Sequence, residues 1–150
     1  MKIQTLAVAA IVALLPLTAG AQNVPKQQSL YDRLGGKQAI TAVVDEFVGR
    51  VAADNRINDF FAATASNPAQ LASFKMKLVD QICEAAGGPC KYTGKDMKSA
   101  HRGMGISTAD FNALVEDLVG ALDKFKVGMA EKSQLLGVLG PMQGQIVEKK

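Results

Sequence analysis

Apolar residues recur with helical spacing in four segments of the chain, over positions 40–51, 71–86, 111–122 and 135–146. Neighbouring apolar positions within each segment are three or four residues apart, which places them on one face of an α-helix. They are Ile40, Val43, Val44, Phe47, Val48 and Val51; Leu71, Phe74, Leu78, Val79, Ile82 and Ala86; Phe111, Leu114, Val115, Leu118, Val119 and Leu122; and Leu135, Leu136, Val138, Leu139, Met142 and Ile146. No segment alternates apolar and polar residues with a period of two, so the pattern predicts an all-α fold with four helices around one core.

Residues that start, stop or bend helices lie at the ends of these segments. They are the glycine pairs 35–36 and 87–88, the pair Asn67 and Pro68, the capping candidates Ser107 and Thr108, and the pair Gly140 and Pro141. The first three sets predict sharp turns or helix ends, and the hydroxyl residues predict an N-cap for the third helix. The Gly-Pro pair lies inside the fourth segment and predicts a kink there.

The beginning of the chain has the features of a secretory signal peptide. A positive residue precedes an apolar run over 6–17, and small residues follow it at 19–21. We expect cleavage near Ala21, which leaves residues 22–150 as one domain in the periplasm or outside the cell. A membrane anchor is the alternative. The run is shorter than the ~20 apolar residues that span a bilayer, and Pro16 interrupts it, so we expect no stable membrane insertion after cleavage.

The net charge of the chain is small. The 17 basic and 14 acidic side chains give +3, which falls by one charge when Lys2 leaves with the signal peptide. The basic residues are spread along the chain and form no dense patch, so we expect no nucleic-acid partner. The densest charged group, residues 148–150, is expected to be a frayed tail.

Cys83 and Cys90 are the two cysteines of the chain. An exported protein meets an oxidising environment, where an even cysteine count favours a disulfide. The segment 87–89, Gly-Gly-Pro, supplies the turn that such a short loop requires, so we expect one disulfide. Free thiols or a Cys/His metal site are the alternatives. The metal site is disfavoured because structural zinc sites usually use four ligands, and the chain has only three Cys and His residues.

The single histidine, His101, lies in the Gly-rich segment 87–107 between the second and third predicted helices. A connection of this length inside a compact domain is usually functional, and we expect a short turn of helix around the histidine. One histidine excludes a two-histidine metal site, and a disulfide would consume both thiols of a Cys–His nucleophile pair. Axial ligation of heme iron needs one neutral imidazole among apolar walls. The alternative is a surface histidine in a mobile loop.

A series of motifs bears on this choice. In chain order they are SLYDRLGG (29–36), DEFVGRV (45–51), FF (60–61), EAAGGPCKYTGKDM (84–97) and HRGMGIS (101–107). Together they resemble the group I truncated hemoglobins, from about Ser29 to Val147. The resemblance implies a two-over-two helical sandwich that encloses heme b (iron protoporphyrin IX), with the first and second long helices packed against the third and fourth.

The same resemblance implies roles for individual residues. His101 matches the proximal iron ligand, with its other ring nitrogen donating to a backbone carbonyl near Met97, and Phe61 matches a heme-contacting phenylalanine. The further wall residues that it implies are Phe47, Phe60, Met97, Met104, Ile106 and Phe111. The candidates for contact with the heme propionates are Lys75, Tyr92 and Arg102. Ordinary core packing and solvated surface cations are the alternatives for these two sets.

The sequence departs from the family pattern on the distal side of the expected heme. Many group I members have a tyrosine at the position of Val48 and often a glutamine at that of Leu78, while Phe74 occupies the distal gate position. Loss of hydrogen bonds that contribute ~1–3 kcal/mol lowers oxygen affinity by about 5- to 150-fold. Long-term oxygen storage is therefore not expected.

Lys77 is a polar candidate on the same helical face as Phe74 and Gln81, three and four residues away. One expected role is contact with a heme propionate through its long side chain. The other is coordination of iron from the distal side as a neutral amine, which an apolar pocket favours.

The leading functional prediction is a heme protein that reversibly binds a diatomic gas, O2, NO or CO, with oxygen binding or transport as its broad class. The first alternative is a heme-based redox enzyme, a NO dioxygenase or a peroxidase- or nitrite-reductase-like protein, which needs an electron-donor protein as partner. The second alternative is a non-heme helical interaction module. We expect a monomer or a weak dimer.

Overall fold

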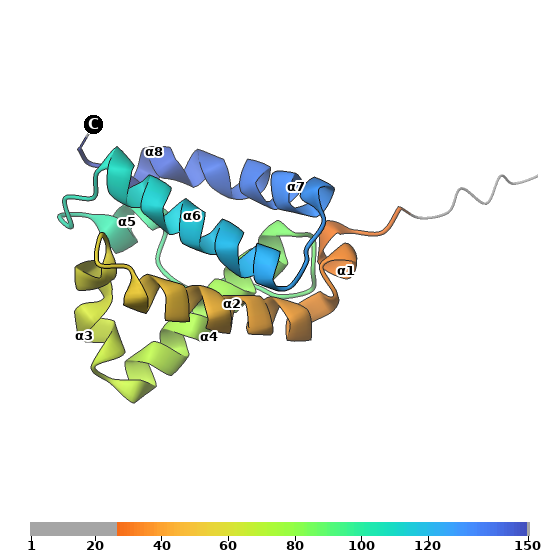
Figure 1. The fold of residues 1–150 in the computed structure, drawn as a ribbon, viewed down its shortest axis with the longest axis horizontal. Coiled ribbons are helices and arrows are strands. Elements are labelled where there is room, and N and C mark those ends of the chain that lie inside the picture. Colours follow the sequence, from red (N-terminus) through yellow and green to blue (C-terminus); the bar gives the residue numbers. More distant parts are fainter. Residues whose placement is uncertain (1–26, 150) are drawn as a thin grey trace, which may run out of the picture.

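The computed structural model describes residues 27–149 (Figure 1). The predicted signal peptide and its cleavage site at Ala21 lie outside this range. The helices in chain order are α1 (Leu30–Arg33), α2 (Gly36–Ala53), η1 (Asn58–Phe61), α3 (Ala62–Ala65), α4 (Pro68–Ala85), α5 (Met97–His101), α6 (Thr108–Lys124), α7 (Met129–Leu139), η2 (Gly140–Met142) and α8 (Gln143–Ile146). Over the described range there is no strand, only one isolated bridge between Ser107 and Lys149, so the all-α prediction is confirmed.

The first long helix, α2, begins at a glycine turn. Ser29 caps the short helix α1 by accepting the Asp32 backbone N–H at 3.1 Å. The chain then passes through Gly35 and Gly36 with φ values of 95° and 76°, which residues with a Cβ rarely adopt. The two glycines therefore let α2 leave α1 at a sharp angle, as the sequence predicted.

The caps of α4 and α6 also follow the sequence. Asn67 accepts the backbone N–H groups of Ala69 and Gln70 at 3.0 and 3.1 Å, and Pro68 occupies the first turn of α4, where its missing N–H costs nothing. Ser107 and Asp110 form a reciprocal capping box at the start of α6. Of the two predicted capping candidates, Ser107 is therefore the one that caps this helix.

The fourth predicted helix is interrupted where the Gly-Pro pair occurs. Helix α7 ends at Leu139, the segment Gly140–Met142 forms a 3-10 turn, and α8 continues from Gln143. The predicted interruption is confirmed, although α7 begins six positions before the first apolar residue of the pattern, at Met129. The short helices α1, η1 and α3 were not predicted, because segments of four residues are too short to show a helical period.

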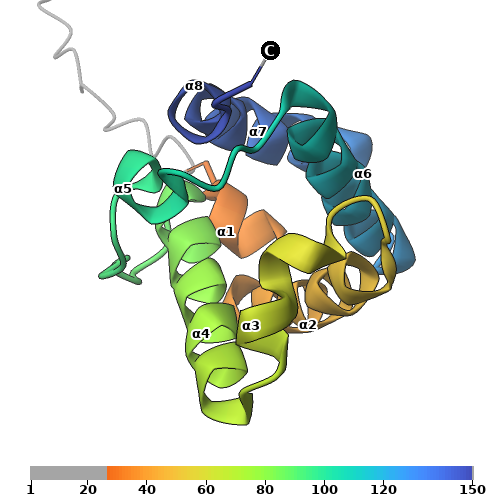
Figure 2. The same cartoon turned by 90° about the vertical axis from the view of Figure 1, so that its left-hand side faces the viewer.

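The helices form two layers around one core. Figure 1 shows α6 and α7 in the layer above α2 and α4, and Figure 2 shows α5 between the end of α4 and the C-terminal helices. Helix α2 packs against both α4 and α6, α7 contacts α4, and α5 packs against α8. The largest fully buried side chains are Val44, Cys83, Leu122 and Leu135, one from each long helix. This is the predicted two-over-two arrangement.

The last residues do not form the frayed tail that the charge pattern suggested. The backbone N–H groups of Glu148 and Lys149 both donate to the carbonyl oxygen of Ile106, at 2.8 and 3.1 Å. The expectation was wrong for these two residues because their hydrogen bonds are made to a segment more than 40 positions away, which local charge cannot indicate. None of the helices over residues 27–149 is long and apolar enough to cross a membrane.

Candidate functional site

His101 is the last residue of α5, and its ring is fixed by the backbone of its own helix. The Nδ1 atom lies 2.7 Å from the Met97 carbonyl oxygen. A carbonyl oxygen only accepts, so Nδ1 carries a proton, and in the neutral imidazole the Nε2 lone pair is then free. Among residues 27–149, no hydrogen bond occupies Nε2. The half-buried imidazole is therefore held in the tautomer that binds a metal through Nε2.

The beginning of α5 is fixed by Asp96. Its side chain accepts the backbone N–H of Ser99 at 2.9 Å. Hydrogen bonds from the Ser99 side chain and backbone hold the pKa of the Asp96 carboxyl below its usual range, so it stays ionised as a helix N-cap.

Tyr92 lies in the loop that leads to α5. Its hydroxyl donates to the Lys95 carbonyl oxygen at 2.7 Å. Burial, with a smaller contribution from the Asp96 charge, raises the pKa of the phenol. The hydroxyl therefore braces the loop in this structure, and the predicted contact of Tyr92 with a heme propionate stays a prediction.

Gln81, Met97 and Met142 form a cluster that joins three elements. The Gln81 amide nitrogen of α4 lies 3.4 Å from the sulfur of Met97 in α5 and 3.4 Å from that of Met142 in η2. Thioether sulfur is a weak acceptor, so these contacts orient the amide without fixing it strongly. The role of Met142 was not predicted. Its place in the apolar pattern of the fourth segment was the only signal, and that pattern indicates core packing alone.

Five of the predicted heme-site residues meet at one cavity of about 450 Å³ between α2, η1, α3 and α4. Those that line it are Phe47, Val48, Phe61, Phe74 and Lys75. The rings of Phe61 and Phe74 lie 5.8 Å apart between centroids and are tilted by 51°. The cavity is therefore lined in large part by aromatic and aliphatic side chains, and two of the predicted distal residues, Val48 and Phe74, are among them. His101 and Met97 do not line this cavity.

The lysines of α4 lie at the edge of this region. The Lys75 ammonium pairs with the Asp45 carboxylate of α2 at 2.9 Å, so in this structure it contacts another side chain of the cavity wall. Lys77 is exposed and lines a second, shallower hollow beside Phe74. Leu78 packs against the core. The predicted contacts of the two lysines with a propionate or with iron stay predictions.

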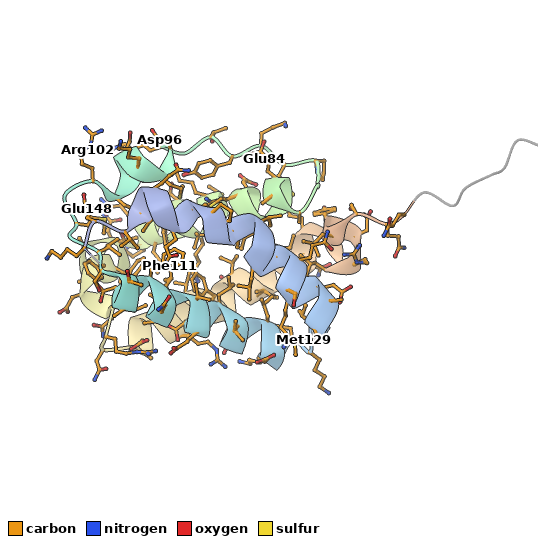
Figure 3. All side chains as sticks on the ribbon, turned by 90° about the horizontal axis from the view of Figure 1, so that it is seen from above. Glu84, Asp96, Arg102, Phe111, Met129 and Glu148 are labelled. Atoms are coloured by element: carbon orange, nitrogen blue, oxygen red, sulfur yellow. A yellow bond between two sulfur atoms is a disulfide. The ribbon has the colours of Figure 1, made fainter. Side chains whose placement is uncertain are left out.

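The remaining predicted wall residues come from the segment after His101 and from η1. Ile106 is buried, Phe111 is half-buried near the start of α6 (Figure 3), and Phe60 packs against the core. Met104 is 36% exposed. Arg102 is exposed at the same end of the molecule as Asp96 and Glu148 (Figure 3). Both residues are therefore exposed in this structure, and the predicted contacts of Met104 with the heme wall and of Arg102 with a propionate stay predictions.

The two cysteines are joined. The sulfur atoms of Cys83 and Cys90 are 2.06 Å apart, which ties the end of α4 to the loop before α5. The predicted disulfide is thus present, and it leaves no free thiol for a nucleophile or a Cys/His metal site. Among the described residues there is no group of three His, Cys, Asp or Glu side chains suited to holding a metal ion.

These residues fit a heme better than a bare metal ion. One imidazole with a free Nε2 supplies a single protein ligand. A single ligand suffices only when the bound group itself supplies most of the remaining ligands of the metal. Phenylalanine side chains of α2 and α4 line the cavity, and the Met97 thioether of α5 lies one turn before His101 in its own helix; these are the apolar side chains that a porphyrin site requires. The donor set and the walls therefore match an axially ligated porphyrin.

Comparison with known proteins agrees with this fit. The family model of the bacterial-like globins matches residues 29–148. A group 1 truncated hemoglobin of Mycolicibacterium paratuberculosis is 37% identical over 118 residues, which are 79% of this chain and 83% of that protein. One of Tetrahymena pyriformis is 34% identical over 102 residues, covering 68% of this chain and 80% of that protein.

Solved structures give the same result. The Fe(III) form of the Tetrahymena pyriformis truncated hemoglobin superposes with a TM-score of 0.73 at 30% identity, over 81% of this chain and 100% of that one. A Synechococcus 2/2 hemoglobin in the cyanomet state, with covalently attached heme, has a TM-score of 0.73 at 29% identity with the same coverage. The chain therefore belongs to the bacterial-like globins, as a group I two-over-two truncated globin.

Proposed function

We propose that this protein binds heme b through the Nε2 atom of His101 and reversibly binds a small diatomic gas. The observation that carries the proposal is the 2.7 Å contact between His101 Nδ1 and the Met97 carbonyl, because in the neutral imidazole it places the proton on Nδ1 and leaves the Nε2 lone pair free for iron. Heme, when bound, supplies the iron that coordinates the gas. The protein supplies one fixed imidazole and an apolar surrounding.

The distal side favours ligands that need no hydrogen bond. Val48 and Phe74 line the cavity, and Leu78 packs against the core beside them. None of these three side chains can donate to a polarised bound oxygen molecule. Carbon monoxide and nitric oxide lose less from this absence than oxygen does, so the protein is suited to brief ligand binding rather than to oxygen storage.

The same residues argue against efficient peroxide chemistry. Cleavage of an O–O bond is assisted by an acid–base group close to the reacting oxygen. The three distal residues Val48, Phe74 and Leu78 provide none. A redox enzyme that receives electrons from a separate donor protein is the second candidate. It is distinguished by multiple turnovers of NO with O2, or of nitrite or peroxide, in the presence of a reductant.

Export is part of the proposal. The apolar segment at the beginning of the sequence and the disulfide between Cys83 and Cys90 both suit an oxidising compartment. We propose that the mature protein acts in the periplasm or outside the cell, as a monomer or weak dimer. Mass spectrometry of the secreted or periplasmic fraction tests this, since a mature protein that begins at Gln22 is expected.

The deciding experiment for the heme site is absorption spectroscopy of the mature protein with hemin. The wild-type protein should show a Soret band that shifts on reduction and on addition of CO. His101→Gly should lose the normal proximal spectrum and recover it when imidazole is added, whereas Lys98→Ala, on the same short helix, should behave as wild type. An unchanged spectrum in His101→Gly would show that the iron is held elsewhere.

A further inference from the structure

The C-terminal segment closes back onto the loop that follows His101. The backbone N–H groups of Glu148 and Lys149 donate to the Ile106 carbonyl at 2.8 and 3.1 Å, and Thr108 N–H donates to the Lys149 carbonyl at 3.1 Å. Ser107 and Lys149 form a parallel bridge. The last residues of the described chain are thus bonded along the segment between α5 and α6.

Within this contact, one carboxylate binds two backbone amides of the loop. Glu148 Oε1 accepts the Gly103 N–H at 2.7 Å, and Glu148 Oε2 accepts the Gly105 N–H at 2.6 Å. Hydrogen bonds to an ionised acceptor are shorter and stronger than those between neutral groups. We call this arrangement, made of Gly103, Gly105 and Glu148, the carboxylate clasp.

The backbone of the loop is shaped for the clasp. Gly103 and Gly105 have φ values of 79° and 66°, in the left-handed region that a side chain disfavours. In this loop the N–H groups of both glycines point at the same carboxylate. The two hydrogen bonds also hold the pKa of the Glu148 carboxyl below its usual range, which agrees with an ionised acceptor. Figure 3 shows Glu148 at the same end of the molecule as Arg102 and Asp96, the residues that flank α5.

Helix α5 depends on such external contacts. It has only five residues, and a helix of this length is not stable alone. Its principal packing partner is α8, and the chain leaves α8 directly into Glu148. Asp96 fixes the first turn of α5, while the clasp fixes the backbone two residues after His101. The helix that carries the imidazole is therefore anchored from both sides.

We propose that Glu148 is a positioning residue for His101: through the clasp it fixes the loop that sets the depth and orientation of the imidazole toward the heme iron. The inference rests on the proposed function, because it takes His101 as the iron ligand. Without the clasp, α5 still forms and binds iron, but the imidazole is held less firmly. The iron–histidine bond then varies in length and tilt, and heme leaves faster.

Two substitutions at Glu148 test the role of its carboxylate. Glu148→Ala removes both acceptors, and Glu148→Gln keeps one oxygen of the same reach without the charge. Glu116→Gln is the matched control, because Glu116 is an exposed carboxylate on α6 that pairs with Arg56. All backbone bonds of Lys149 and Ile106 remain available in each variant, so the fold is expected to persist, which far-ultraviolet circular dichroism checks.

The first measurement is amide hydrogen exchange at Gly103 and Gly105, without and with hemin. Glu148→Ala should accelerate exchange at both amides by roughly 10- to 100-fold, Glu148→Gln by less, and Glu116→Gln not at all. This readout does not need heme. Unchanged exchange in Glu148→Ala would overturn the clasp whether or not the protein binds heme.

The second measurement is the iron–histidine stretching band of the ferrous protein by resonance Raman spectroscopy, together with the rate of hemin transfer to an acceptor protein. Glu148→Ala should broaden or shift the band and accelerate hemin loss several-fold, with Glu148→Gln intermediate. A wild-type band and hemin-loss rate in Glu148→Ala, with the band abolished in His101→Gly, would overturn the positioning role and leave the proposed function intact. If the wild-type protein takes up no hemin, the proposed function fails instead.

Discussion

The Lys75 ammonium lies 2.9 Å from the Asp45 carboxylate, so a single ion pair joins α4 to α2 at the wall of the distal cavity. The two side chains are 33% and 55% exposed, which limits the contribution of the pair to stability to about 0–1 kcal/mol. Both residues line the cavity, so we expect the pair to affect access to it more than the stability of the fold.

Lys75→Met should accelerate the association of CO with the ferrous protein several-fold, because it releases this contact between the two helices. Flash photolysis gives the rate. A matched control exists on the same two helices, where Lys37 pairs with Asp80 at 3.1 Å away from the cavity. Lys37→Met should leave CO association unchanged, and equal rates in wild type and Lys75→Met would show that the pair does not limit access.

Val48→Tyr should raise the oxygen affinity by about 5- to 150-fold, because a hydroxyl at this wall of the cavity can donate a hydrogen bond worth ~1–3 kcal/mol. The effect should appear as slower oxygen dissociation in stopped-flow experiments. Val48→Phe adds the ring without the hydroxyl and serves as the control. If both variants slow dissociation equally, bulk rather than hydrogen bonding is responsible.

Removal of the disulfide by the double substitution Cys83→Ala and Cys90→Ala should lower the free energy of unfolding by about 2–3 kcal/mol, since the bond closes a short loop in the unfolded chain. Urea denaturation measures this change. Reduction of the wild-type protein with a thiol should lower its stability in the same direction and leave the double variant unaffected. A wild-type protein that is insensitive to the thiol while unfolded would contradict the disulfide.

The free energy of unfolding should decrease in acid, because the cap of α6 depends on an ionised carboxylate. The Ser107 hydroxyl and backbone N–H donate to Asp110 and hold its pKa below the usual range. A carboxyl whose pKa is depressed by folding contributes stability above its unfolded-state pKa of about 3.9, and this contribution is lost as the pH falls through the lower folded-state value.

Asp110→Asn should therefore be less stable than wild type at neutral pH and should lose less stability between about pH 5 and pH 2. Urea unfolding of the heme-free protein across this range is the measurement. Ser107→Ala removes the same interaction from the other side, so the double variant should be little worse than either single one. Fully additive losses would indicate that the two residues stabilise the helix separately.

The sequence predicted the parts of this molecule that have a local cause. Ser107 and Asn67 are caps that act within three residues, and the glycines at 35 and 36 bend the chain where they stand. The short helix at His101 and the hydrogen bond to Met97 were expected as well. Each of these features depends on neighbours along the chain, which periodicity and motif reading can detect.

The features that were missed depend on distant partners. Glu148 meets the amides of Gly103 and Gly105, which lie 45 and 43 residues earlier, and backbone amides have no signature in a sequence. The Lys75 pair with Asp45 likewise required the two helices to be placed side by side. The contact of Met142 with Gln81 likewise joins residues 61 positions apart.

The carboxylate clasp joins two segments that are synthesised at different times, so it can form only late in synthesis. The imidazole of His101 is translated long before Glu148, so the nascent chain already carries the residue for cofactor capture while its anchor is still missing. Under the proposed role of the clasp, firm retention of the cofactor begins only after Glu148 has been added to the chain. A purification tag appended to the carboxyl end would crowd the same anchor, and recombinant production is better served by a tag near the other end of the mature chain.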